Sequence, residues 1–352
     1  MKHLIMIGAG HTHLHLLASL SAQRLAGVQI TLIAAHPYPF YSGMLPGFVT
    51  GQHPLLDCVI PLAPLLKNAA VSWLQRSASR LNAATRTVTL DDGSTLHYDV
   101  LSINTSAVLD RPKIETIMPG AREHALFVLP LEVFAALWPK VGDLALQKPL
   151  RVALVGGGAT GFELACAVAQ RLPDASVTLL SGDAPVAANY PSAVQAMVRQ
   201  ALKAGRITVI QDRCVGVAAG ELTLASGARL ACDVPIIAIG AQAPGWLQGC
   251  GLALNDQGFV TVDAFQRSTS HPEVLAVDDP ARVGPPFTRN LRAVLAGVAP
   301  KAAKPQQETL HLLSCGNQRA IASWGSWAVQ GQWVGWIKDW IDRRFVKQHS
   351  QG

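Results

Sequence analysis

The sequence predicts an α/β protein in which one order of elements occurs twice, each time around a parallel sheet. Three observations carry this prediction. A short apolar run enters a glycine-containing turn at residues 4–10 and again at 151–158, a helix with periodic apolar residues follows each turn, and a second apolar run follows each helix. Buried parallel strands have continuous apolar runs of this kind, and the intervening helices cover the faces of the sheet.

The elements of the two copies correspond in order. The first copy is expected to contain a strand over 4–7, a helix over 14–25, a strand over 28–33, a strand over 87–90, a turn at Asp92-Gly93 and a strand over 98–103. The second is expected to contain a strand over 151–155, a helix over 162–172, a strand over 176–180, a strand over 222–224, a turn at Ser226-Gly227 and a strand over 232–239. This order indicates two Rossmann-like domains, each with a parallel sheet.

The second glycine turn has the complete pattern Gly156-x-Gly158-x-x-Gly161. The first glycine lets the chain bend sharply out of the strand, and the second lets a pyrophosphate approach the backbone. The third lets the helix pack closely on the strand, so that the phosphates lie at the helix N-terminus. A dinucleotide site is the prediction, and a tight turn without a ligand is the alternative.

The first glycine turn departs from this pattern. It keeps Gly8 and Gly10 but has His13 at the third glycine position. Ala34-Ala35-His36 stand where a carboxylate usually binds the adenosine ribose. Loss of the cofactor from this turn is therefore an open alternative.

Composition excludes several classes of protein. Of 352 residues, 49% are apolar and only 15% are charged, where about 25% is usual, which excludes disorder and coiled coil. The net charge of 29 − 23 = +6 suits anionic cofactors or an anionic membrane surface, but no basic run indicates a nucleic-acid partner. The six cysteines lack zinc or disulfide spacing, which predicts reduced thiols in a cytoplasmic protein. We expect neither a signal peptide nor a membrane-spanning helix.

Three further segments support a resemblance: 235–244, which includes the last strand of the second copy, and 258–263 and 271–279, which follow it. With the two glycine turns, they resemble the pyridine nucleotide-disulfide oxidoreductase superfamily, which comprises flavoproteins with two dinucleotide-binding domains. The resemblance implies an FAD domain that is split around an inserted NAD(P)H domain. The expected boundaries are 1–110 and 245–310 for FAD, 115–244 for NAD(P)H, and 311–352 for a C-terminal Trp-rich segment.

The segment Tyr-Ser-Gly-Met-Leu-Pro-Gly at 41–47 indicates a branch of that superfamily. It is similar to the proline-containing loop that faces the flavin in type II NADH dehydrogenases and sulfide:quinone reductases. With His11-Thr12-His13 it is closest to a branch often fused to selenophosphate synthetase. The resemblance implies hydride transfer from NAD(P)H to flavin and electron transfer to a quinone or another small acceptor. A sulfur- or selenium-linked flavin reductase and a non-catalytic nucleotide-binding protein without FAD are the alternatives.

The glycine turns and the resemblance together predict the site residues. Glu163, which matches a family glutamate near the nicotinamide, and Pro46 are the expected catalytic residues. A carboxylate favoured by the dipole of its helix is the alternative for Glu163. The flavin's ribityl chain is expected at Asp279, and Asp278 and Val283 depart from the family pattern. The expected cofactor-binding residues are Gly8, Gly10, His11, Thr12, Ser42, Gly43, Met44, Leu45, Asn104, Thr105, Asp279, Gly284, Gly156, Gly158, Ala159, Thr160, Gly161, Ser181 and Gly240.

Two features of these turns stay open. Ser181 ends a strand where NAD-preferring proteins often have an acid, and no arginine follows closely, so the choice between NADH and NADPH is undecided. His11, His13 and His15 suggest a metal, but only His11 and His15 share a helix face. No third ligand lies nearby in the sequence, so we expect contacts to phosphates or flavin and no metal site.

The C-terminal segment contains five of the eight tryptophans, between Trp324 and Trp340. On a helix from Trp333, one broad face carries Val334, Trp336, Ile337, Trp340, Ile341 and Phe345, and the other carries mainly Lys338, Asp339, Asp342 and Arg343. This composition predicts a helix lying on the inner face of the cell membrane. A helix packed on the flavin domain, or on a second subunit in a homodimer, is the alternative.

Overall fold

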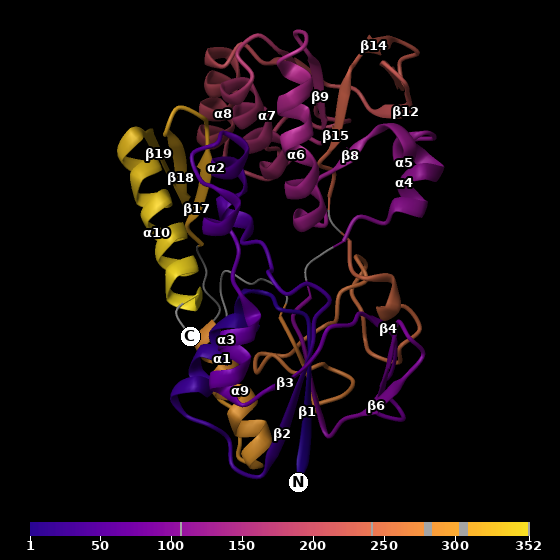
Figure 1. Ribbon diagram of the computed structural model, residues 1–352, viewed down its shortest axis with the longest axis vertical. Coiled ribbons are helices and arrows are strands. Elements are labelled where there is room, and N and C mark those ends of the chain that lie inside the picture. The colour runs from indigo at the N-terminus through magenta and orange to yellow at the C-terminus, as the bar shows by residue number, and fades with distance from the viewer. Residues whose placement is uncertain (106–107, 241, 278–283, 303–308, 351–352) are drawn as a thin grey trace.

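The computed structural model describes residues 1–105, 108–240, 242–277, 284–302 and 309–350. The predicted site residue Asp279, and the departures at Asp278 and Val283, lie outside the described residues. Two five-stranded sheets lie in the lower and upper parts of the molecule in Figure 1. A C-terminal unit lies along one flank of both parts.

The first sheet has the strand order β16-β7-β1-β2-β3, and all its strands are parallel. Its strands are β1 (Lys2–Ile7), β2 (Val28–Ile33), β3 (Ser72–Leu74), β7 (Val100–Ile103) and β16 (Val274–Ala276). Its helices are α1 (His11–Ala22), α3 (Leu62–Ala69) and α9 (Gly284–Ala296), of which α1 packs against both others. The predicted parallel sheet of the first copy is therefore confirmed.

Strand β16 comes from much later in the chain than its neighbour. Val274 pairs with Leu101 and Ala276 pairs with Ile103, in parallel register. The first sheet is thus completed by a segment that follows the whole second sheet in sequence.

The second sheet has the order β11-β10-β9-β15-β8, also entirely parallel. Its strands are β8 (Leu126–Phe127), β9 (Arg151–Val155), β10 (Ser176–Leu180), β11 (Thr208–Ile210) and β15 (Val234–Ile237). The helices of this half are α4 (Arg111–Ile117), α5 (Ala121–His124), α6 (Leu131–Ala145), α7 (Ala159–Arg171) and α8 (Ser192–Ala204). The second predicted parallel sheet is also confirmed.

A small antiparallel sheet accompanies each parallel one. The first contains β4 (Ala78–Asn82), β5 (Thr87–Leu90) and β6 (Thr95–His97), and the second contains β12 (Cys214–Ala218), β13 (Glu221–Leu224) and β14 (Arg229–Ala231). The predicted turns lie between β5 and β6 and between β13 and β14. Gly93 and Gly227 have φ angles of +83° and +86° there, a left-handed conformation that favours glycine.

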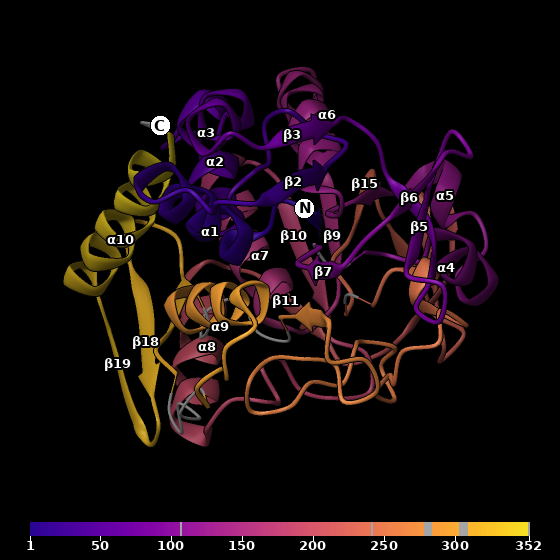
Figure 2. The ribbon, with the colours of Figure 1, turned by 90° about the horizontal axis from the view of Figure 1, so that it is seen from below.

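The C-terminal unit consists of a three-stranded antiparallel sheet and the helix α10 (Gln332–Ser350). Its strands are β17 (His311–Ser314), β18 (Ala320–Trp324) and β19 (Trp327–Gly331). Figure 2 shows α10 on the outer side of α1 and α2 (Leu45–Val49). Helix α10 also contacts the short 3-10 helix over Ser42–Met44, and two further 3-10 turns span Leu55–Asp57 and Gly245–Leu247. No helix among the described residues has the length and apolarity needed to cross a membrane.

The two helices that follow the glycine turns begin earlier than predicted. Helix α1 starts at His11 and α7 starts at Ala159, because Gly10 and Gly158 are their N-caps. The backbone amides of the turn are therefore part of the helix N-terminus itself. Helix α1 ends at Ala22, because Gln23 has an extended backbone conformation.

Candidate functional site

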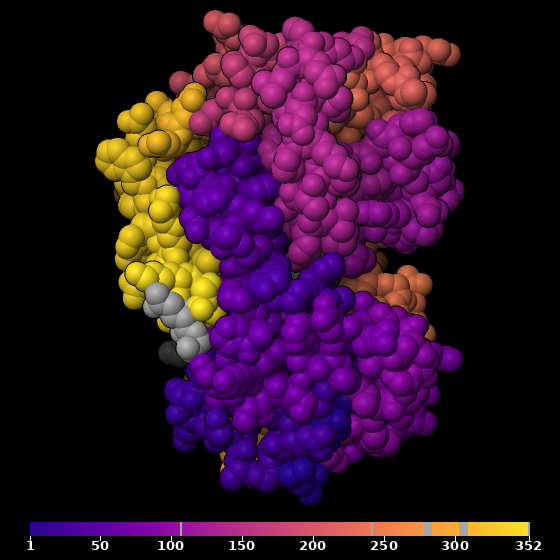
Figure 3. All heavy atoms as spheres, in the orientation of Figure 1, coloured from indigo at the N-terminus to yellow at the C-terminus, as the bar shows by residue number. Residues whose placement is uncertain are grey.

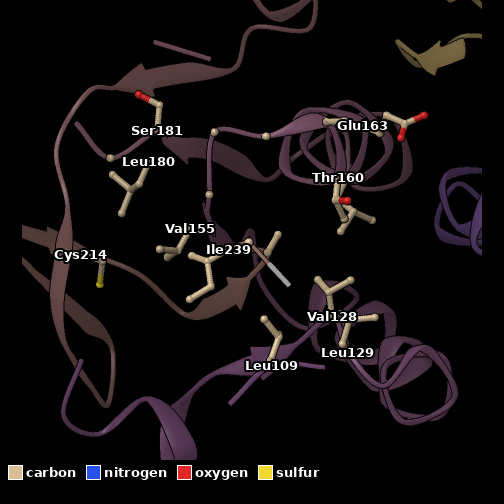
Figure 4. A pocket seen from close by; sticks show the side chains of 18 of the residues that line it. Leu109, Val128, Leu129, Val155, Thr160, Glu163, Leu180, Ser181, Cys214 and Ile239 are labelled. Carbon is tan, nitrogen blue, oxygen red and sulfur yellow. The ribbon is translucent and has the colours of Figure 1, made fainter. Parts of the chain in front are cut away.

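A cavity of about 610 Å³ lies at the carboxyl ends of the strands of the second sheet. Figure 4 shows side chains from several separate segments around it, including Leu109, Val128 and Ile239. Open parallel sheets bind their ligands at this edge. The cavity is therefore the candidate functional site.

The second glycine turn forms one wall of the cavity, and its three glycines have different surroundings. A Cβ atom on Gly161 would collide with the carbonyl oxygen of Gly156, and one on Gly156 would collide with that of Ala238. Around a Cβ built on Gly158, no described atom outside the turn lies within 4 Å. The predicted residues Gly156, Gly158, Ala159 and Thr160 all line the cavity. The turn thus leaves its backbone open to a ligand where a pyrophosphate is expected.

The loop predicted to face a flavin forms another part of the cavity wall. Ser42, Leu45 and Pro46 line it, and α2, which contains Leu45 and Pro46, packs against α7. Glu163 also lines the cavity and accepts a hydrogen bond from the backbone N–H of Ser314 at 2.7 Å. Burial raises the pKa of Glu163, and the nearby Lys338 partly offsets this effect. The two predicted catalytic residues are therefore brought to one cavity.

A buried ion pair from α10 lies behind this loop. Lys338 Nζ donates to Asp342 Oδ2 at 2.7 Å and to the Gly43 carbonyl oxygen at 2.8 Å. The Tyr41 hydroxyl donates to Asp342 Oδ1 at 3.2 Å, and the Phe345 ring stacks on Tyr41. Both charged side chains are only 10% exposed. The side of α10 predicted to carry Lys338 and Asp342 is therefore the side that contacts this loop, which supplies partners for both groups.

Several large apolar side chains of the C-terminal unit are exposed. Trp327 and Trp336 are 83% and 61% exposed, while Val334 is buried against the protein. We use the term tryptophan face for the exposed residues Trp324, Trp327, Trp333, Trp336, Ile337 and Trp340. Figure 3 shows the C-terminal segment on the outer flank of the molecule. The predicted apolar face is therefore divided between the protein interior and this surface.

The first glycine turn packs closely on Asn104. A Cβ atom on Gly8 or Gly10 would lie 2.5 Å from an oxygen atom of Asn104. Asn104 Oδ1 accepts hydrogen bonds from the backbone N–H groups of Thr12 and His13, each at 3.1 Å. The Thr12 hydroxyl is buried, and no described residue offers it a hydrogen-bond partner. A buried hydroxyl without a partner at a helix N-terminus fits a phosphate of a dinucleotide such as FAD.

The histidines near this turn are held in neutral form. His13 Nδ1 lies 2.6 Å from the Gly8 carbonyl oxygen and Nε2 lies 2.6 Å from Ser102 Oγ. Burial lowers the pKa of His13 to about 4. The ring of His11 packs on Tyr41, and burial together with His349 lowers its pKa to about 4. In the described parts of the chain, no three His, Cys, Asp or Glu side chains gather as a metal site would require.

The remaining predicted residues lie in several parts of the structure. Ser181 and Gly240 line the cavity. Met44 is buried in the core, and a Cβ atom on Gly43 would approach Asp342. Thr105 lies against Gly8. Gly284 begins α9, and a Cβ atom on it would lie close to the ring of His15.

Several cavity residues were missed by the sequence analysis because they belong to no motif. Leu109, Val128, Leu129, Asp212, Arg213 and Cys214 line the cavity. Val128 follows β8 directly, and Asp212 follows β11 by two residues. Their positions just after parallel strands were the signal that could have identified them, because all such strand ends meet at one edge of the sheet.

Comparison with known proteins identifies one family match and several similar oxidoreductases. The chain matches the family described as pyridine nucleotide-disulphide oxidoreductase over residues 2–297. An NADH dehydrogenase-like protein of Mycobacterium tuberculosis is 24% identical over 342 residues, which cover 91% of this chain and 78% of that protein. A demethylphylloquinone reductase of Synechocystis is 23% identical over 264 residues, covering 72% and 64%.

Among solved structures, the sulfide:quinone oxidoreductase of Aquifex aeolicus superposes with a TM-score of 0.79 at 16% identity, covering 99% of this chain and 92% of that one. A likeness at this identity establishes the shared fold. The family match spans both parallel sheets and both glycine turns. The chain therefore belongs to the pyridine nucleotide-disulphide oxidoreductase family, whose members are oxidoreductases that bind FAD and NAD(P)H.

Proposed function

We propose that the protein oxidises NAD(P)H and passes the electrons to a quinone-type acceptor. One observation carries this proposal: a single cavity is lined at one side by the open glycine turn of Gly158 and at its end by Ser42, Leu45 and Pro46. A nucleotide held at the turn would extend toward the loop beside which the flavin is expected. The names of the Synechocystis and Aquifex proteins, which refer to quinones, support the choice of acceptor.

The residues that would hold FAD are those of the first glycine turn and of the loop, namely Gly8, Gly10, Thr12, Asn104, Ser42 and Gly43. When bound, FAD supplies the two-electron chemistry between the nucleotide and the acceptor. The chain contributes position and electrostatics. Gly158 lets the nucleotide phosphates reach the N-terminus of α7, whose dipole favours negative charge. Glu163 and Pro46 lie at the opposite end, where the reacting ring of the nucleotide is expected.

Thiol chemistry is not part of this proposal. All six cysteines lie in the described chain, and of these Cys214 lines the cavity. Cys214 lies at the end away from Glu163, and burial raises its pKa, which lowers its thiolate fraction. The cysteines therefore give no support to the sulfur- or selenium-linked alternative, whose support is the sulfide in the name of the Aquifex protein.

The test is an anaerobic titration of the purified protein with NADH or NADPH, monitored by the visible absorption spectrum. We expect flavin bands that bleach on addition of NADH or NADPH and return on addition of a water-soluble quinone. The Gly158→Ala variant should keep the flavin bands and require more nucleotide for bleaching. A colourless protein that fails to take up added FAD would contradict the proposal and favour the non-catalytic alternative.

We also propose that the tryptophan face docks on an anionic lipid surface. Exposed apolar patches of this kind mark interaction sites. Arg343, Arg344 and Lys347 are exposed on the same helix, and the Arg344 guanidinium lies 5.1 Å from the ring centre of Trp340. Tryptophan beside Arg and Lys is the composition that binds membrane interfaces.

Flotation with vesicles of phosphatidylcholine and phosphatidylglycerol tests this docking. The double variant Trp336→Glu, Trp340→Glu should float less than the unaltered protein. The matched control is Leu56→Glu, because Leu56 is also exposed and apolar but lies in a different segment. Equal flotation of both variants would contradict membrane docking. Conversion of a dimer to a monomer by the Trp variant, seen by light scattering, would instead assign the face to a second subunit.

A further inference from the structure

The far end of the cavity, opposite Glu163, is formed by residues that follow the strands β10 and β11. Ser181, Gly182, Asp212 and Arg213 line this end, and Figure 4 shows Ser181 and Cys214 on the side away from Glu163. Strand β10 lies next to β9, which carries the glycine turn. In Rossmann domains the end of this second strand meets the adenosine ribose, whose 2′ position is a hydroxyl in NADH and a phosphate in NADPH.

The strand end itself offers no carboxylate to the ribose. Ser181 stands where an acid would accept a hydrogen bond from the 2′-hydroxyl and repel a 2′-phosphate. The Ser181 hydroxyl is buried, and no described residue forms a hydrogen bond with it. Rotation about the Cα–Cβ bond would let this small hydroxyl serve a ligand in the cavity.

Arg213 reaches the same place from a different segment. The backbone N–H of Gly182 donates to the Asp212 carbonyl oxygen at 3.1 Å, so the ends of β10 and β11 continue side by side. A Cβ atom on Gly182 would lie 4.0 Å from Arg213 Cγ. The guanidinium is thus brought beside the end of β10, although 32 residues separate Arg213 from Ser181 (213 − 181).

The guanidinium remains available for a phosphate. Its Nε lies 3.1 Å from Asp183 Oδ1, and the two side chains are 60% and 82% exposed. Exposed ion pairs of this kind contribute little, and an arginine has four further N–H donors besides Nε. Bidentate binding of phosphate is the contact for which this group is best suited.

Besides the exposed Asp183, Asp212 is an acid near Arg213 and lines the cavity, but its carboxylate is already engaged. Its Oδ1 accepts the backbone N–H of Arg213 at 2.7 Å, and its Oδ2 accepts that of Ser226 at 3.3 Å. The first bond lies within the turn between β11 and β12, and the second links this turn to the one between β13 and β14. The carboxylate therefore stabilises the backbone that presents Arg213.

We infer that NADPH is the preferred donor and that Arg213 binds its 2′-phosphate, with Ser181 leaving room for that group. This inference rests on the proposed nucleotide site and names its substrate. Arg213 is a specificity-determining residue, since it lies at the end of the cavity away from the reacting ring.

Calorimetric titration of the full-length protein with adenosine 2′,5′-bisphosphate and with 5′-AMP tests the inference. The bisphosphate should bind roughly tenfold or more tightly than 5′-AMP, because of the charge-assisted bonds to phosphate. Arg213→Gln should make the two affinities nearly equal, and Ser181→Glu should reverse the preference. Arg229→Gln is the matched control, because Arg229 is an exposed, ion-paired arginine of the same half outside the cavity.

Binding of 5′-AMP as tightly as the bisphosphate by the unaltered protein would overturn the inference. The outcomes also separate it from the proposed function, because these ligands bind without any electron transfer. A protein that prefers the bisphosphate but shows no flavin bleaching contradicts only the proposed function. Equal bleaching of the flavin by NADH and by NADPH would contradict only the inferred preference for NADPH.

Discussion

At the scale of single residues, the two glycine turns differ in what replaces the third glycine. In the second turn Gly161 permits direct contact between helix and strand. In the first, His13 fills the same position and holds helix and strand together through its two ring nitrogens. Hydrogen bonds through a buried neutral ring thus take the place of close backbone packing.

This difference predicts an acid-sensitive contribution to stability. The unfolded state binds a proton at His13 near pH 6.5, whereas the folded state binds it only near pH 4. Stability from this group is therefore fully present above pH 6.5 and is lost as pH falls toward 4, by about 3 kcal/mol in total. Urea unfolding of His13→Gln between these pH values should show a shallower pH dependence than the unaltered protein. An unchanged slope would contradict the assignment of a neutral buried ring.

Two glycines of the second turn are expected to have different roles: Gly161 in the stability of the fold and Gly158 in nucleotide binding. Gly161→Ala should lower the free energy of unfolding by about 1–3 kcal/mol, because its Cβ atom would collide with the Gly156 carbonyl oxygen. Gly158→Ala has space for its Cβ atom and a φ of −76°, so it should leave stability nearly unchanged and weaken nucleotide binding. Thermal unfolding and calorimetry measure the two effects, and equal destabilisation by both variants would refute this division.

At the scale of elements, α10 is fixed to the rest of the protein by charged groups as well as apolar ones. Lys338 and Asp342 are paired, buried and bonded to the loop around Gly43. Lys338→Met should cost about 3–5 kcal/mol, because it leaves the Asp342 carboxylate buried without its partner. The double variant Lys338→Met, Asp342→Leu should recover much of this loss.

Arg343→Met is the control for this prediction. Arg343 pairs with Asp339 at the same spacing on the same helix, but its side chain is exposed. We expect a change below about 1 kcal/mol in chemical unfolding. If the single Lys338 variant were as mild as Arg343→Met, the buried pair would not contribute to docking of the helix.

The sequence predicted the secondary-structure elements more accurately than the contacts between those elements. Apolar runs such as 28–33 and 151–155 identified strands correctly, because a buried parallel strand is apolar along its whole length. The sequence placed Lys338 and Asp342 together on one face of α10, but the pattern of charges does not reveal that this face contacts Tyr41 and Gly43. Likewise Arg213 could not be placed beside Ser181 from sequence distance, since that proximity depends on the pairing of β10 with β11.

At the scale of the whole molecule, the two halves meet at the cavity. The glycine turn of the second half provides one wall, and α2 of the first half packs on α7 to complete the other end. Side chains from both halves are thus needed to enclose a ligand. The predicted boundaries at residues 110, 244 and 310 remain predictions, and expressed segments with those ends would test them.

The late strand β16 has a consequence for synthesis on the ribosome. The parallel strands of the second half, from β8 to β15, all lie in one continuous stretch of the chain. In the first half, the outer edge of β7 can pair with β16 only after residues 274–276 have been synthesised. Domains generally fold as units during translation. Stalled nascent chains of increasing length should therefore gain protease resistance in the second half first, and in the first half only after residue 276 has left the exit tunnel. Simultaneous protection of both halves would show that the nascent chain does not follow this order.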